Sequence, residues 1–75
     1  MSIEGFVLLH PRGHYAIYPY PGERHDLACG DRLEIDTGRE WITMWVRRGI
    51  NGYYLSGDKI SFYPLMVYAR LMNGE

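Results

Sequence analysis

Polar and apolar residues alternate along much of this chain, and glycine or proline interrupts the alternation every few residues. The clearest case is residues 32–36, RLEID, in which Leu33 and Ile35 face one side and three charged residues face the other. A period of two residues is typical of a half-buried β-strand. Nine Gly and four Pro are spread over the chain. Within a helix, each Gly lowers the stability by roughly 1 kcal/mol and each Pro by roughly 3 kcal/mol. The pattern therefore predicts strands and tight turns, with no helix before the last ten residues.

The expected strands follow from the runs of β-branched and aromatic residues between these interruptions. They are residues 3–10, 14–18, 32–36, 40–48 and 53–55, with 60–63 and 65–72 as further candidates, the last as a strand or a helical turn. Residues 37–39 and 49–52 are expected to be turns, and Asn51-Gly52 supplies the residues that tolerate positive φ. Residues 40–48 are apolar on both faces, which predicts a central strand.

Five to six short strands in one chain of this size predict a single antiparallel meander. Such a meander buries one face best by curling into a partly open, SH3-like barrel. The 75 residues suffice for one domain, residues 1–75, and not for two. A core this small needs large apolar side chains, so at least one of Trp41 and Trp45 is expected inside it.

The composition narrows the possible settings and partners. Eight basic residues oppose nine acidic ones, giving a formal net charge of −1, which suits a non-specific nucleic-acid binder poorly. The single cysteine, Cys29, excludes a disulfide within the chain and fits a reducing compartment. The apolar runs are far shorter than the roughly 20 residues of a membrane helix, and no signal peptide is apparent. We therefore expect a cytoplasmic protein that does not enter a membrane.

From about His25 onward, the chain contains five short motifs that also occur together in other proteins. They are Leu27-Ala28-Cys29-Gly30-Asp31, Leu33-Glu34-Ile35, Trp41-Ile42, Tyr53-Tyr54-Leu55 and Tyr68-Ala69-Arg70-Leu71. In these motifs the chain resembles a family of small bacterial and phage proteins of unknown function. The segments that carry the resemblance span roughly two-thirds of the chain. It departs from the family at Arg47, where Glu is usual, and near Val67, where Gly is usual. The resemblance implies a small β fold and a phage or mobile-element setting, and it transfers no catalytic residue.

Few residues offer catalytic or metal-binding chemistry. His10, His14 and His25 with Cys29 would be the candidate metal ligands, but a zinc site needs three or four converging ligands and their spacing is not that of a ligand pair. Cys29 lies in no known nucleophile motif, and a small thiol is more often structural. The carboxylates, which are Glu34, Asp36, Glu40 and Asp58, fit a solvated charge pattern better than an acid–base pair. We expect no enzyme activity, no metal and no cofactor.

The aromatic residues and Arg form the more informative set. Seven Tyr and two Trp accompany seven Arg and one Lys. Aromatic rings stack on bases, while Arg adds charge and cation–π contacts, so such a set suits a nucleotide, a single strand or a protein hot spot. The alternative, which we favour for the set as a whole, is that these rings build the core. The candidate ligand- or partner-binding residues are Trp45, Arg47, Arg48, Tyr53, Tyr18 and Tyr20.

Three functional hypotheses follow from these features. The first is a non-enzymatic binding module of phage or mobile-element origin that occupies a protein partner, such as a component of host defence. The second is a homo-oligomer that binds or sequesters a nucleotide, since Arg forks suit phosphates. The third is a small-barrel nucleic-acid-binding protein, which requires the Arg residues to gather on one face.

Overall fold

The computed structural model describes residues 2–72, and they form eight strands and no helix. The strands are β1 (Ser2–Leu9), β2 (Tyr15–Pro19), β3 (His25–Asp26), β4 (Arg32–Asp36), β5 (Trp41–Gly49), β6 (Gly52–Ser56), β7 (Ser61–Phe62) and β8 (Met66–Met72). The all-β, antiparallel class predicted from the sequence is confirmed. The expected number of five to six strands is too low. The sequence does not predict β3, because a strand of two residues is too short to show an alternating pattern.

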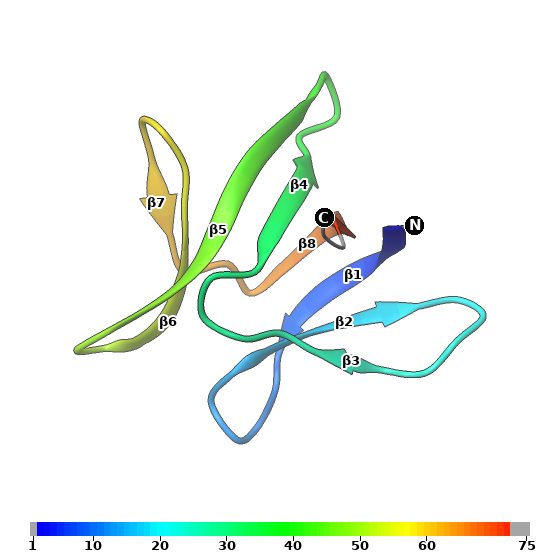
Figure 1. Cartoon of the computed structure of the whole chain (residues 1–75), viewed down its shortest axis with the longest axis horizontal. Helices are drawn as coiled ribbons and strands as arrows, with labels where there is room; N and C mark the ends of the chain where they lie inside the picture. Colours follow the sequence, from blue (N-terminus) through cyan, green and yellow to red (C-terminus); the bar gives the residue numbers. More distant parts are fainter. Residues whose placement is uncertain (1, 73–75) are drawn as a thin grey trace.

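All eight strands belong to one antiparallel sheet with the order β3-β2-β1-β8-β4-β5-β6-β7. A meander would keep chain neighbours side by side, so the expected meander is corrected at two connections, β3 to β4 and β7 to β8. The last strand, β8, lies between β1 and β4, and pairs Gly5 with Ala69 on one side and Leu33 with Leu71 on the other. Both chain ends are thereby brought together (Figure 1).

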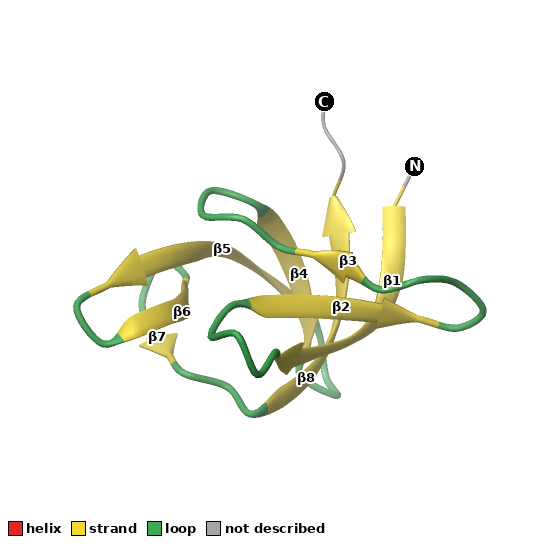
Figure 2. Cartoon of the chain, turned by 90° about the horizontal axis from the view of Figure 1, so that it is seen from below, coloured by secondary structure: helices red, strands yellow, loops and turns green. Residues whose placement is uncertain are grey.

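The sheet curls so that its two halves cover one hydrophobic core (Figures 1 and 2). The core consists of Val7, Tyr15, Ile17, Leu27, Leu33, Ile35, Met44, Val46, Leu55, Ala69 and Leu71. The Tyr15 hydroxyl of β2 donates a hydrogen bond of 3.0 Å to the carbonyl oxygen of Pro64, just before β8. This bond joins segments from opposite halves of the sheet. The edges, β3 and β7, remain separate, so the sheet is open.

Strand β5 is central, as predicted, because β4 and β6 flank it. Its inward face carries Met44 and Val46, both fully buried. Trp41 and Trp45 lie on the opposite side, which we call the outer face. Trp41 is 36% exposed and Trp45 is half-buried. The expectation that one Trp lies in the core is therefore wrong, since aliphatic residues with Tyr15 and Met44 fill that space.

The turns on either side of β5 are placed as the sequence predicts. Gly38 and Gly52 have φ values of 90° and 106°, a region that disfavours side chains. Within residues 2–72 only glycines have positive φ, so Asn51 does not share this conformation with Gly52. The Asp36 carboxylate accepts a hydrogen bond of 2.8 Å from the Gly38 N–H. The β4–β5 hairpin is thus closed by its own turn residues.

Candidate functional site

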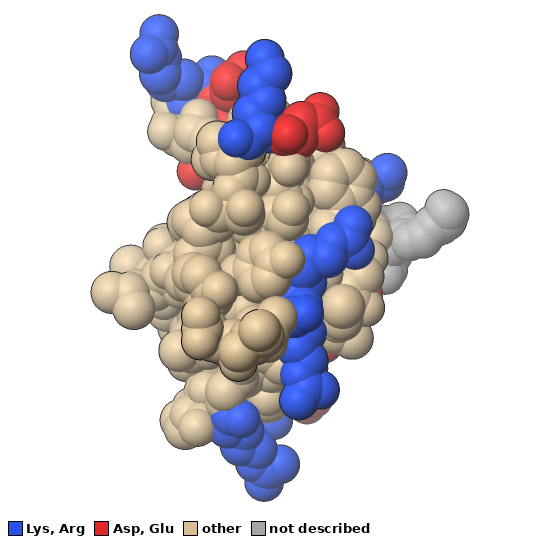
Figure 3. Space-filling view, turned by 90° about the vertical axis from the view of Figure 1, so that its left-hand side faces the viewer, with Lys and Arg blue, Asp and Glu red and all other residues tan. Residues whose placement is uncertain are grey.

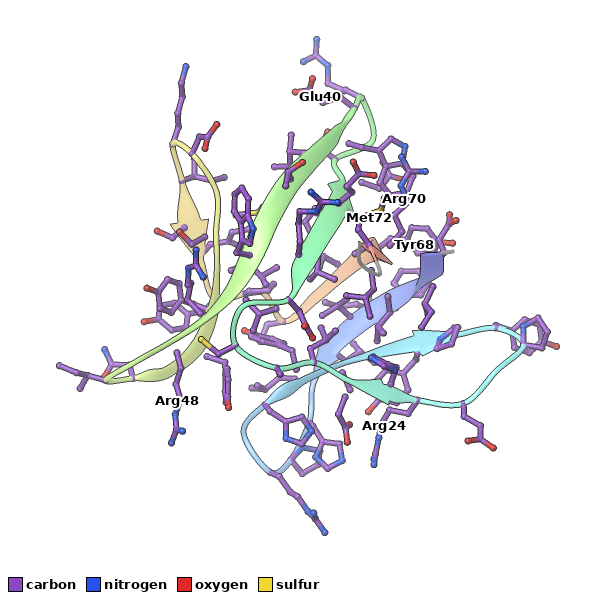
Figure 4. The ribbon with its side chains drawn as sticks, in the orientation of Figure 1. Arg24, Glu40, Arg48, Tyr68, Arg70 and Met72 are labelled. Atoms are coloured by element: carbon purple, nitrogen blue, oxygen red, sulfur yellow. The ribbon has the colours of Figure 1, made fainter. Side chains whose placement is uncertain are left out.

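The outer face brings together side chains from both ends of the chain. Strand register sets Phe6 of β1 opposite Tyr68 of β8, and Trp41 of β5 opposite Asp36 of β4. In the next row, Arg70 of β8 lies between Glu4 of β1 and Glu34 of β4. We call Phe6, Trp41, Tyr68 and Arg70 the aromatic–Arg platform. Alternate residues of β8 share this face, and Tyr68, Arg70 and Met72 lie side by side there (Figure 4).

Arg70 is fixed by two different contacts. Its Nε donates a hydrogen bond of 2.7 Å to Glu34 Oε1. Its guanidinium carbon lies 4.0 Å from the centre of the Trp41 ring. The Arg70 and Glu34 side chains are 34% and 27% exposed, so water partly screens their ion pair. The cation–π contact and the charged hydrogen bond together hold the guanidinium in one orientation on an accessible surface.

Tyr68 links the charged row to the aromatic row. Its ring meets Phe6 edge to face at 5.1 Å and Trp41 at 6.4 Å between centroids. Its hydroxyl donates a hydrogen bond of 3.1 Å to Glu4 Oε2. Partial burial, and then the bond to the Glu4 carboxylate, raise the pKa of the phenol above its ordinary value. The phenol therefore acts as a hydrogen-bond donor.

The platform combines exposed apolar area with oriented polar groups. Phe6 is 47% exposed and Trp41 is 36% exposed, although both are large apolar residues. Trp, Tyr and Arg are the residues that most often dominate the binding energy of protein interfaces. Since their neighbours already hold them in place, little side-chain freedom remains to be lost on binding. Chemically, this surface offers a partner apolar area, an oriented cation and a hydrogen-bond donor.

Four of the candidate residues from the sequence lie around β5 and β6 but do not form one site. Arg47 is opposite Tyr54, and Arg48 is opposite Tyr53. The Arg48 guanidinium lies 5.7 Å from the Tyr53 ring centre, which makes them a cation–π pair. Trp45 instead lines a hollow of about 430 Å³ beside the β6–β7 turn. Tyr53 lines a different hollow of about 290 Å³.

Tyr18 lies on β2, and Tyr20 lies in the connection from β2 to β3, away from β5 and β6. Tyr18 is opposite Phe6, so it continues the aromatic row of the platform. Tyr20 is 98% exposed in the β2–β3 connection and lines a third hollow, of about 540 Å³. The six candidates are therefore divided among separate places, with Tyr18 alone next to the platform.

Sequence reasoning missed Arg70, which lies over the Trp41 ring, and Phe6, which contacts Tyr68. Alternation within β1, β5 and β8 does place each residue on a defined strand face. What no local pattern gives is the insertion of β8 between β1 and β4. That insertion sets Arg70 beside Glu34, 36 positions earlier in the chain. A search for complementary charges on alternating strands would have proposed the Arg70–Glu34 pair among several others.

A separate surface, which is largely uncharged, covers the side of the molecule formed by β5, β6 and β7 (Figure 3). Ile50 at the β5–β6 turn is fully exposed, and Ile60 and Tyr63 are more than half exposed. The Tyr54 and Tyr63 rings are 5.6 Å apart there. This surface has apolar area but lacks the oriented charge of the platform.

The residues considered for metal binding or catalysis have other environments. His10 and His14 are stacked at 4.7 Å, whereas His25 and Cys29 are exposed. In the described part of the chain, no three His, Cys, Asp or Glu side chains are grouped to hold a metal ion. Glu34 is paired with Arg70.

The Leu27–Asp31 motif forms the turn that leads into β4. Leu27 is buried in the core, and Gly30 has a φ of 100°. The Asp31 carboxylate accepts a hydrogen bond of 2.9 Å from the Ala28 N–H. The Gly30 N–H donates to the Val46 carbonyl at 2.7 Å, which attaches the turn to β5. These contacts give the motif a role in folding, and none of them involves Cys29.

Comparison with known proteins leaves the family open. Among residues 2–72 there is no helix long and apolar enough to cross a membrane. The resemblance to small phage and bacterial proteins and the SH3-like likeness remain predictions. No family model, curated protein or solved structure matches this chain.

Proposed function

We propose that this chain is a non-enzymatic binding module that occupies a protein partner through the aromatic–Arg platform. The observation that carries the proposal is the exposed Trp41 ring with Arg70 held 4.0 Å above it by Glu34. An isolated exposed ring is common on protein surfaces. A ring that is joined to an oriented cation and contacts Tyr68, which in turn contacts Phe6, has the composition of an interface hot spot.

The charge around the platform favours a protein partner over a nucleotide or nucleic acid. Binding of phosphates depends on cations that can neutralise them. Arg70 is already paired with Glu34, the carboxylate of Glu4 belongs to the same row, and Asp36 belongs to the next row. One face of the Trp41 ring is covered by Arg70, which leaves less room for a stacked base. A partner with apolar and basic side chains fits this surface best.

The setting of this function belongs to the same proposal. The resemblance to small phage proteins suggests a mobile-element origin, and a component of host defence would be a fitting partner. A cytoplasmic location agrees with the single, exposed Cys29.

Affinity capture with matched variants tests the proposal. The tagged chain, Trp41→Ala, Arg70→Ala and the control Tyr20→Ala would each be used to recover proteins from a bacterial host lysate. Tyr20 is an exposed aromatic residue away from the platform, so its loss controls for non-specific adhesion. We expect a stoichiometric partner with the wild-type chain and with Tyr20→Ala, and its loss with both platform variants. Circular dichroism would verify that every variant is folded.

Two results would contradict the proposal. One is a partner that both platform variants retain at wild-type affinity. The other is the absence of any stoichiometric partner, combined with saturable binding of a nucleotide in calorimetry. The second result would favour the nucleotide-binding alternative.

A further inference from the structure

A compact cluster of ionisable side chains joins the β1–β2 turn to the segment that leads into β3. His10 and His14 lie at the two ends of the turn, and their rings are stacked with centroids 4.7 Å apart. Arg24 Nη1 lies 2.8 Å from His10 Nε2, and Arg24 Nε lies 3.0 Å from Asp26 Oδ1. His14 Nε2 lies 3.2 Å from the same oxygen of Asp26. Figure 4 shows Arg24 on the β3 side of the molecule, next to this turn.

Both ring nitrogens of His10 face hydrogen-bond donors. The Arg24 guanidinium, which carries donors only, faces Nε2, and the backbone N–H of Arg12 donates to Nδ1 at 3.1 Å. A neutral imidazole has one ring nitrogen with a free lone pair. It can therefore accept a hydrogen bond from Arg24 or from the Arg12 N–H, but not from both. An imidazolium has none. A proton on His10 therefore turns the contact with Arg24 into two opposed donors, both positively charged.

The groups around His10 act in different directions. Partial burial, followed by the charges of Arg24 and His14, lowers the pKa of His10 below its ordinary 6.5. Arg12 acts in the same direction, and the Asp26 carboxylate acts against it. Since Asp26 is already shared by Arg24 and His14, it does not relieve the direct contact between Arg24 and a protonated His10.

We propose that His10 and Arg24 form a pH-responsive latch that holds the segment 20–26 against the β1–β2 turn when His10 is neutral. Protonation of His10 ejects Arg24 and loosens this segment. Strand β3 is an edge strand of two residues whose register joins it to β2 through Ala16 and Ile17. Opening the latch would thus uncover the outer edge of β2, where a further strand can pair. This inference is independent of the aromatic–Arg platform.

Nuclear magnetic resonance between pH 8 and pH 4.5 tests the latch on the whole chain. The imidazole carbons of His10 report its protonation, and the backbone amides of residues 23–26 report the segment. Arg24→Met removes the charge and the donors but keeps an aliphatic side chain. The matched control, Arg39→Met, removes an exposed Arg of the β4–β5 turn.

In the wild-type chain and in Arg39→Met, we expect His10 to titrate below pH 6.5, with the amides of residues 23–26 shifting at the same midpoint. In Arg24→Met, the His10 midpoint should rise towards 6.5. Amide exchange in β2 should also be faster at acidic pH in the wild-type chain, after correction for intrinsic rates. His10→Gln, which cannot be protonated, should lose most of the acid-induced shifts in residues 23–26.

Three outcomes would overturn the latch. The first is a His10 midpoint at or above pH 6.5 in the folded wild-type chain. The second is a His10 midpoint in Arg24→Met equal to that of the wild-type chain. In the third, residues 23–26 of His10→Gln shift as much with pH as those of the wild-type chain. None of these measurements depends on a binding partner.

Discussion

Replacing Tyr15 with phenylalanine removes one hydroxyl group from the junction between the two halves of the sheet. Tyr15 is 2% exposed, and its hydroxyl donates to the carbonyl of buried Pro64 at 3.0 Å, 49 positions along the chain. Phenylalanine keeps the ring and therefore the packing in the core. The substitution isolates the hydrogen bond that joins β2 to the segment before β8.

The expected loss follows from two contributions. A hydrogen bond contributes about 0.5–1.5 kcal/mol net, and a buried carbonyl left without a donor costs about 1–3 kcal/mol. We therefore expect Tyr15→Phe to lower the free energy of unfolding by about 1–3 kcal/mol. In a domain of this size each kcal/mol corresponds to a decrease in melting temperature of about 4–8 °C. The loss should reside in the denaturant midpoint, with an unchanged m-value, since the exposed surface on unfolding is the same.

Urea denaturation followed by circular dichroism measures this loss. Tyr20→Phe is the control because Tyr20 is 98% exposed, and its effect should stay within about 0.5 kcal/mol. A Tyr15→Phe midpoint equal to that of the control would show that the Pro64 carbonyl finds water, and that the bond does not hold the halves together.

Alkaline pH provides a second readout of the same residue. Burial, and then the neighbouring Tyr63, raise the pKa of Tyr15 above its ordinary value of 10.0. A phenol with a raised pKa stabilises the fold fully below the unfolded pKa, and this contribution is lost as pH rises through the folded pKa. The wild-type chain should therefore lose stability above about pH 10, and Tyr15→Phe should lose less.

Three further predictions test the fold at other points. Gly5→Ala should cost about 1–3 kcal/mol in urea denaturation, because an added Cβ would lie 2.4 Å from the backbone oxygen of Tyr18; wild-type stability would disprove this close approach of β1 and β2. Met44→Ala should cost about 2–5 kcal/mol, since a fully buried side chain of the core is removed, and a loss under 1 kcal/mol would mean that the core collapses to fill the space. The hydrogen-bonding contact with His14 lowers the pKa of Asp26 below 3.8, so its stabilisation is complete above pH 3.8 and disappears as pH falls through the lowered pKa. In acid denaturation Asp26→Asn should lack that component, and a curve parallel to the wild-type one would contradict it.

The sequence by itself determined the local structure of this protein. Alternation in residues 32–36 fixed β4 and its faces, because neighbouring side chains of a strand point to opposite sides. The spacing of Gly and Pro excluded helices before the last ten residues, because both residues disfavour a helix. Gly38 and Gly52 marked the turns, because glycine tolerates positive φ. These properties depend on a few consecutive residues, and the structure confirms them.

The tertiary structure alone decided which strands meet and which aromatic residues stay outside. Pairing of β8 with both β1 and β4 depends on how the whole sheet covers the core, which no short segment encodes. The same pairing sets Arg70 beside Glu34 and above Trp41. The expectation that at least one Trp lies in the core is wrong, because a strand pattern defines two faces without saying which is buried. Burial of Met44 and Val46 on the inward face left Trp41 on the outer face, where it became part of the platform.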